Sequence, residues 1–128
     1  MIKVGIKGND EIKVVDENTA KSVGSGMLEV FATPAMTALM EKTASESVMQ
    51  YLAEGEGTVG ISLNVRHVSA TPIGLTVFCE SELVEIDRKR LVFSIKVSDE
   101  KGLIGEGTHE RFIINNEKFM EKAMAKLG

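Results

Sequence analysis

The sequence of 128 residues predicts an α+β fold in which one long apolar helix packs against an antiparallel β-sheet. Three observations lead to this prediction. Apolar residues recur with a helical period between positions 33 and 52, the period changes to two after position 56, and short turn sequences separate the alternating segments. Short connections join antiparallel neighbours, whereas parallel strands need long crossovers. A chain of this length can bury one hydrophobic core, so residues 1–128 are expected to form a single domain.

The long helix is expected from Thr33 to Leu52. Thr33 is a candidate N-cap, and Pro34 suits the first helical position, where its missing N–H is not needed. The glycine-containing segment 53–57 is expected to end the helix. Apolar side chains recur along it at three- and four-residue steps, which gives a stripe wide enough to cover a sheet: Met36, Leu39, Met40, Ala44, Val48, Tyr51 and Leu52.

The remaining elements follow from alternation and turn chemistry. A short strand at 11–15 and a polar loop or lid at 16–26 precede the helix, and a short helix at 116–127, capped by Asn116, closes the chain. Four alternating segments lie between the two helices, separated by the turns TPIG, DRKR and DEKG: 57–70, 75–86, 91–98 and 103–114. A strand, a long helix and four further strands are the element order of a hotdog-like α+β domain, a long helix wrapped by an antiparallel sheet.

Composition and charge exclude several classes of function. Fifteen Lys and Arg residues against nineteen Asp and Glu give a net charge of −4, which argues against nucleic-acid or anionic membrane partners. The single cysteine, Cys79, cannot form an internal disulfide and is expected to be buried, and no Cys/His cluster has metal-ligand spacing. No apolar run resembles a signal peptide or a membrane span. We therefore expect a cytoplasmic protein without a metal site.

Two polar residues stand out on elements that are otherwise apolar. Glu41 falls near the middle of the long helix, in a stripe with Thr37 and Ser45. This stripe faces either water, or a cleft or second subunit where a carboxylate does acid/base or nucleophilic work. His67 is expected on the inward face of strand 57–70, with Val59, Ile61, Leu63 and Val65, while Gly60 takes the opposite face. It is either a core histidine bonded to a backbone carbonyl or a base at a pocket edge.

A second pair of polar residues lies on the last strand. His109 and Arg111 share one face with Gly105 and Gly107. This face is either solvated or leaves room for a ligand or another backbone, because glycines in a strand mark bulges and close approaches.

The spacing of the candidate residues favours a shared site. Thr33 and Glu41 are eight positions apart, which on a helix is a rise of about 12 Å, so the two side chains cannot hydrogen-bond directly. A reaction that uses both needs either an extended substrate or a second chain, and unpaired sheet edges favour pairing of subunits. We therefore expect a homodimer with the site at its interface, and pairing of dimers into a tetramer stays open.

Four segments together resemble a known family. VFATPAMTALME, YLAEGEGTVG, VRHVSATPIGLTV and IGEGTHERFII are similar to segments of the hotdog-fold thioesterases of the fluoroacetyl-CoA thioesterase type, and the similarity spans about residues 28–119. The resemblance implies a catalytic set of Thr33, Glu41 and His67, with substrate contacts from Gly60 and Arg111. It implies no cofactor, because coenzyme A is part of the substrate.

The resemblance also bears on the acyl group. The fluoroacetyl-specific member carries an aromatic gate residue in an extended lid, whereas Met27 stands at the matching position and the preceding segment AKSVGSG is short. We therefore expect a thioesterase for short or small acyl-CoA substrates, with Met27 contacting the substrate. The alternatives are a non-catalytic acyl-CoA or acyl-carrier binding module and a hotdog hydratase or dehydratase. The latter commonly uses an Asp/His pair in a differently spaced segment, which is not found here.

Overall fold

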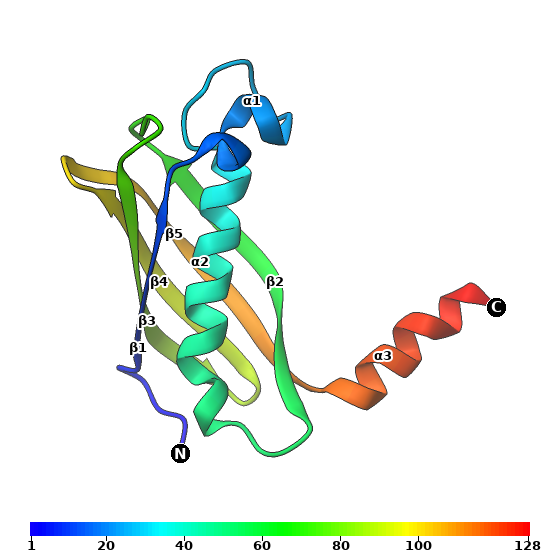
Figure 1. Ribbon diagram of the computed structural model, residues 1–128. Helices are drawn as coiled ribbons and strands as arrows, with labels where there is room; N and C mark the ends of the chain where they lie inside the picture. The colour runs from blue at the N-terminus through cyan, green and yellow to red at the C-terminus, as the bar shows by residue number, and fades with distance from the viewer.

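The computed structural model describes all 128 residues and shows one five-stranded antiparallel sheet packed against a long helix, α2 (Thr33–Val48) (Figure 1). The strand order is β1-β3-β4-β5-β2, which leaves β1 and β2 at the two edges. The strands are β1 (Lys7–Lys13), β2 (Glu56–His67), β3 (Thr76–Asp87), β4 (Arg90–Asp99) and β5 (Gly102–Asn115), and the two short helices are α1 (Ala20–Val23) and α3 (Asn116–Met124). Short 3-10 turns cover Asp16–Asn18, Met49–Tyr51 and Ala125–Leu127. The predicted α+β class and the order of one strand, the long helix and four strands are confirmed.

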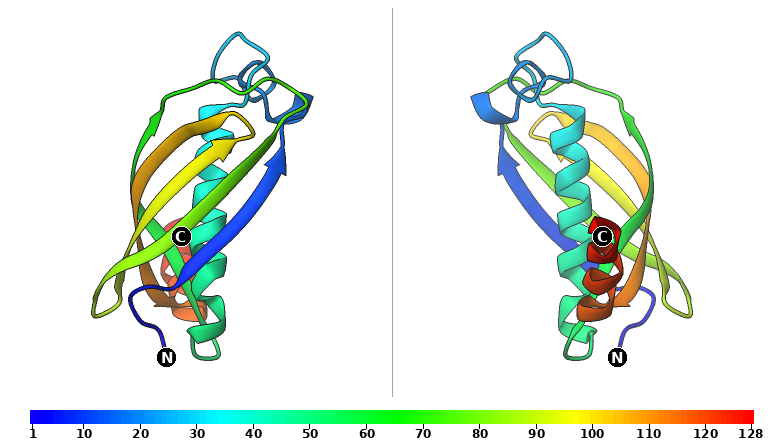
Figure 2. Two further views of the ribbon diagram at one scale, coloured as in Figure 1. Left: turned by 90° about the vertical axis from the view of Figure 1, so that its left-hand side faces the viewer. Right: turned by 90° about the vertical axis from the view of Figure 1, so that its right-hand side faces the viewer.

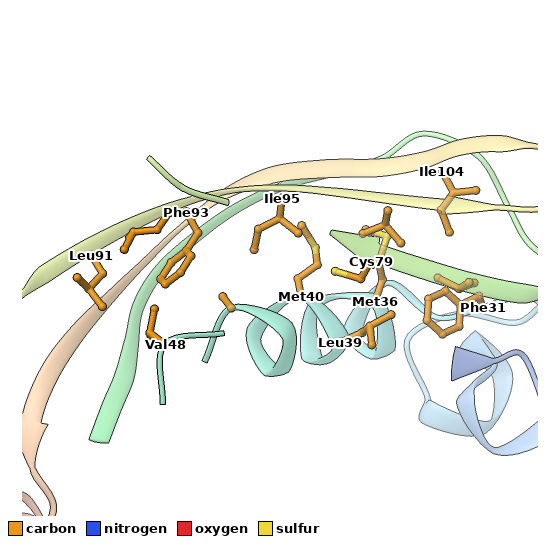
Figure 3. Packing of buried hydrophobic residues seen from close by; sticks show 14 of the residues in the cluster. Phe31, Met36, Leu39, Met40, Val48, Cys79, Leu91, Phe93, Ile95 and Ile104 are labelled. Atoms are coloured by element: carbon orange, nitrogen blue, oxygen red, sulfur yellow. The ribbon is translucent and has the colours of Figure 1, made fainter. Parts of the chain in front are cut away.

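The core lies between α2 and the concave face of the sheet, which curves around the helix (Figure 2). Met36 and Met40 of α2 lie against strand residues such as Cys79 and Ile95 (Figure 3). Full burial of a side chain of this size stabilises the fold by about 1.5 to 3 kcal/mol. The buried cluster is Val14, Phe31, Met36, Leu39, Met40, Ala44, Val48, Val77, Cys79, Leu83, Leu91, Phe93, Ile95, Val97 and Ile104. The helix that carries the candidate site is therefore held firmly on the sheet.

The glycines of β5 serve this packing. A β-carbon on Gly105 would lie 2.6 Å from the sulfur of Met36, and one on Gly107 would lie 3.2 Å from the methyl carbon of Met40. Their missing side chains let α2 and the carbonyls of the neighbouring strand approach. The space beside Gly105 and Gly107, predicted to take a ligand or another backbone, is therefore filled by the methionines of α2 and the backbone of β2.

Several element boundaries differ from the predictions. Thr33 is the first residue of α2, and Ala32 occupies the capping position, so Thr33 does not cap the helix. The α-helix ends at Val48, and Met49–Tyr51 continue as a 3-10 turn. Asn115 caps α3, because its side chain accepts a hydrogen bond from the backbone N–H of Lys118, and Asn116 is the first helical residue.

The two ends of the chain contribute little to the core. The first strand covers Lys7–Lys13 and not 11–15. Helix α3 buries no residue and points away from the sheet (Figure 1). No helix is both long enough and apolar enough to cross a membrane.

A β-bulge in β2 changes the predicted alternation. Gly60 pairs with Arg111 and Ser62 pairs with Glu110, so Ile61 is an extra residue without a partner. A bulge rotates the strand at that point. Leu63, Val65 and His67 keep the predicted inward face, but Ile61 is 52% exposed and Val59 pairs with Phe112 on the outer side. The predicted inward placement of Val59 and Ile61 and the outward placement of Gly60 are wrong.

Candidate active site

Thr33 and His67 form a hydrogen-bonded pair at one end of α2. Oγ1 of Thr33 lies 2.7 Å from Nδ1 of His67, which joins the first turn of the helix to the last residue of β2. Nε2 of His67 is buried without a hydrogen-bond partner, and burial lowers the pKa of this imidazole. The ring is therefore neutral near pH 7, and Nδ1 is the nitrogen that shares a hydrogen bond with the hydroxyl of Thr33.

An open pocket surrounds this pair. Thr33 and His67 line it together with Phe31, Val68, Ser69 and Ala70, and with Ala20, Ser25 and Val30 from the part of the chain before α2. The segment that was expected to be a loop or lid therefore forms part of its wall. Met27 does not line this pocket and is 86% exposed, so the single chain does not bring Met27 to the Thr33–His67 pair.

Arg111 is held in a second group of residues, the Arg111 cluster, made of Glu41, Thr58, Gly60, His109 and Arg111. The guanidinium is buried, and three of its N–H groups have acceptors. Nε donates to Oγ1 of Thr58 at 2.8 Å, Nη2 to the carbonyl of Thr58 at 2.9 Å, and Nη1 to Nε2 of His109 at 3.0 Å. Burial lowers the pKa of Arg111, but a guanidinium stays charged in proteins. The cluster thus contains a fixed positive charge.

Glu41 approaches this charge from the helix. Its Oε2 lies 4.0 Å from Nη1 of Arg111, and its side chain is 46% exposed. The carboxylate is therefore neither fully solvated nor held in a close ion pair. A buried cation lies on one side of it, and its other side is exposed to solvent. Of the predicted environments, a purely solvated face is excluded, because a buried guanidinium lies beside the carboxylate.

The bulge brings Gly60 into the same cluster. A β-carbon on Gly60 would lie 3.1 Å from Oε2 of Glu41, 3.1 Å from Cε1 of His109 and 3.3 Å from Nη1 of Arg111. Only a residue without a side chain fits among these three groups without displacing one of them. The backbone of Gly60 therefore lies next to a carboxylate, an imidazole and a guanidinium.

The predicted catalytic residues fall into two places along α2. No hydrogen bond or ion pair links Glu41 or Arg111 to Thr33 or His67. The eight-residue spacing between Thr33 and Glu41 corresponds to a rise of about 12 Å. One chain therefore presents a hydroxyl–imidazole pair and a carboxylate–guanidinium pair at separate positions.

Two residues of the Arg111 cluster were not among the predicted site residues. Thr58 alternates with Gly60 before the bulge, so placing Gly60 inward would have identified it. Strand alternation predicts His109 on the same face as Arg111, but the family resemblance implies a contact for the arginine only. It is 1% exposed, which excludes the solvated outer face that the sequence had left open.

Comparisons with known proteins identify the family of the chain. The model of the fluoroacetyl-CoA-specific thioesterase family FlK matches residues 14–117. A fluoroacetyl-CoA thioesterase from Streptantibioticus cattleyicolor is 43% identical over 98 residues, which cover 77% of this chain and 70% of that protein.

Solved structures give the same result. A structure of the fluoroacetyl-CoA thioesterase FlK superimposes with a TM-score of 0.93 at 35% identity, covering 98% of each chain. A thioesterase superfamily member from Thermus thermophilus reaches a TM-score of 0.89 at 26% identity, covering 99% of this chain and 93% of that one. The predicted hotdog fold and the predicted enzyme class, a thioester hydrolase, are confirmed by these matches. The chain belongs to the family of fluoroacetyl-CoA-specific thioesterases.

Proposed function

We propose that this protein hydrolyses small acyl-CoA thioesters in a site that uses Thr33, Glu41 and His67. The observation that carries the proposal is the 2.7 Å hydrogen bond between Thr33 and His67, which pairs a hydroxyl with a neutral imidazole across 34 positions of sequence. Such a pair is the arrangement by which proteins orient and activate an oxygen for acyl transfer. The Arg111 cluster adds a carboxylate that stays open to solvent.

The environments of the two proton-exchanging groups suggest different roles. Nε2 of His67 is closed off and Nδ1 is engaged by Thr33, whereas the carboxylate of Glu41 is half exposed. Glu41 is therefore the group that meets the thioester, as a base for water or as the nucleophile. His67 acts through the hydroxyl of Thr33. The backbone N–H of Gly60 is the proposed donor to the oxyanion that develops on the carbonyl oxygen.

The reaction balances without any further group. Oxygen from water forms the new bond to the acyl carbon, the carbon–sulfur bond breaks, and the pair of electrons leaves with the sulfur of coenzyme A. The proton removed from water returns to the thiolate. A thiolate is a good leaving group, so stabilising the oxyanion and placing the attacking oxygen are the main requirements. Protein groups from the two chains therefore suffice, and we propose no cofactor.

The substrate proposal rests on the relatives. Structures of FlK variants contain acetyl-CoA in one case and fluoroacetate with coenzyme A in another. Since this chain carries Met27 in an exposed loop and not an aromatic gate, we propose that it accepts several short acyl groups without a strong preference for fluoroacetyl.

We propose that the active unit is a homodimer. Strand β2 is twelve residues long and lies at an open edge of the sheet, and unpaired edge strands favour pairing with another chain. The separation of Glu41 from the Thr33–His67 pair supports a site completed by the partner chain. We also propose a cytoplasmic location, as the single free cysteine, Cys79, favours a reducing compartment.

The test is release of free thiol from a panel of acyl-CoAs, namely acetyl, fluoroacetyl, butyryl, longer-chain and aromatic. The wild type should turn over the short members best, and Glu41→Gln and His67→Ala should each lose at least about 10²-fold in kcat. An acyl-CoA binding module would bind the same compounds in calorimetry without releasing thiol. Turnover that Glu41→Gln leaves unchanged would contradict the role given to the carboxylate.

A further inference from the structure

His109 lies at the centre of the Arg111 cluster with both ring nitrogens occupied. Nδ1 is 2.8 Å from the carbonyl oxygen of Ser62, and Nε2 is 3.0 Å from Nη1 of Arg111. The ring is 1% exposed, and Phe93 of β4 lies beside it at a centroid distance of 6.4 Å. Nothing from solvent competes for either nitrogen.

These two partners determine where the proton sits. A carbonyl oxygen can only accept and a guanidinium N–H can only donate, so Nδ1 must carry the proton and Nε2 must accept. Protonation of Nε2 would place an N–H of the ring against an N–H of the guanidinium. Burial first, and then the positive charge of Arg111, lower the pKa of this imidazole, while Ser62, Glu41 and Glu110 act in the opposite direction.

The contact from His109 decides which way Nη1 of Arg111 turns. Thr58 binds Nε and Nη2, which leaves Nη1 between the imidazole at 3.0 Å and Glu41 at 4.0 Å. A buried N–H that loses its acceptor costs free energy, so without His109 this group would move to the nearest acceptor. Oε2 of Glu41 lies 4.0 Å away, and an ion pair with it would remove the open carboxylate from the site.

We propose that His109 is a positioning residue that acts as a neutral imidazole, protonated on Nδ1, to hold Arg111 beside Glu41 without letting the two ions close on each other. It does not touch the substrate. It keeps the guanidinium available as a fixed positive charge and keeps the carboxylate free. The catalytic consequence rests on the proposed function, whereas the tautomer of His109 does not.

The tautomer can be measured without any turnover. The chain contains only two histidines, so in the His67→Gln protein the imidazole ¹⁵N signals belong to His109 alone. We expect the proton on Nδ1, an unprotonated Nε2, and no change in either signal between pH 8 and about pH 5.5, well below the ordinary histidine midpoint of about 6.5. A proton on Nε2, or titration near pH 6.5, would overturn the proposal.

The catalytic role is tested by two substitutions. His109→Phe keeps a ring beside Phe93 but removes the acceptor, and displacement of a positioned group by about 1 Å can cost about 10²-fold in kcat. His109→Gln can accept from Arg111 through its amide oxygen and donate to Ser62, so it should recover at least tenfold of that loss. KM should stay within about threefold in both, because the substrate contacts remain.

Thr108→Val is the matched control. Thr108 is on the same strand and exposed on the opposite face, and its side chain makes no hydrogen bond to the Arg111 cluster, so its substitution should leave kcat unchanged. Equal loss in the folded His109→Gln and His109→Phe proteins, or no loss in His109→Phe, would overturn the positioning role. Absence of turnover in the wild type would instead contradict the proposed function, and the ¹⁵N measurement would still decide the tautomer.

Discussion

Gly60 and Glu41 occupy adjoining positions: a β-carbon on the glycine would lie 3.1 Å from Oε2 of the glutamate. It would lie equally close to Cε1 of His109, which is buried and cannot retreat, so the exposed carboxylate must move. We therefore predict that Gly60→Ala folds normally but lowers kcat by about tenfold or more, since a small displacement of a catalytic group costs rate.

Steady-state kinetics and thermal unfolding of the Gly60→Ala protein, side by side with the wild type, separate the two effects. A loss of rate with an unfolding midpoint within a few degrees of wild type is the expected result. If the variant instead keeps full kcat, Glu41 can shift without loss of rate, and the close packing around Gly60 is not needed for the reaction.

The face of β2 on which Gly60 lies could not be predicted from the sequence. Strict alternation predicts Gly60 on the face opposite to Leu63. The bulge at Ile61 inserts one extra residue, so Gly60 and Leu63 lie on the same face. A glycine inside a strand is a known signal of a bulge, but the sequence does not say on which side of it the extra residue falls. That single residue decides whether Thr58 and Gly60 face the helix or the solvent.

The helix and the order of the elements along the chain are easier to predict because their signals are long and repeated. The apolar stripe of α2 spans several turns, so an error of one residue at its start does not change the face it buries. The hydroxyl of Thr33 is different: as an N-cap it would bind the helix backbone, but one position later it is free to bind His67. Such a tertiary hydrogen bond depends on contacts between residues 34 positions apart, which local sequence does not encode.

Stability should fall on the acid side of neutrality because of the two histidines. Burial lowers the pKa of both His67 and His109 in the folded state. The unfolded chain therefore takes up protons first, near pH 6.5, and the unfolding free energy decreases as the pH falls below that value, by at most about 1.4 kcal/mol per pH unit for each histidine. Above pH 7 this contribution is fully present.

Urea unfolding at several pH values between 8 and 5 measures this effect. The midpoint should be constant from pH 8 to 7 and then decrease, and His109→Gln should flatten the decrease. If the wild-type midpoint does not change down to pH 5, protonation of the two histidines does not destabilise the fold, and this prediction is wrong.

The thiol of Cys79 should be unreactive in the native protein. Its side chain is 1% exposed, and burial raises the pKa of the thiol to about 11, so almost no reactive thiolate forms near pH 8. We predict no reaction with a thiol-reactive dye in buffer and one reactive thiol per chain in denaturant. This matters for any thiol-release assay: rapid labelling of the folded protein would contradict the buried position and would add a background signal.

The most direct test of a shared catalytic site is complementation between two inactive variants. Glu41→Gln and His67→Ala chains are unfolded together, refolded as a mixture, and assayed for thiol release from acetyl-CoA, with each variant refolded alone as the control. If each site takes Glu41 from one chain and His67 from its partner, half of the randomly paired dimers are heterodimers with one intact site, and about a quarter of wild-type activity returns. If the mixture is no more active than the separate variants although heterodimers form, Glu41 and His67 do not meet across a subunit boundary, and the account of the site is wrong.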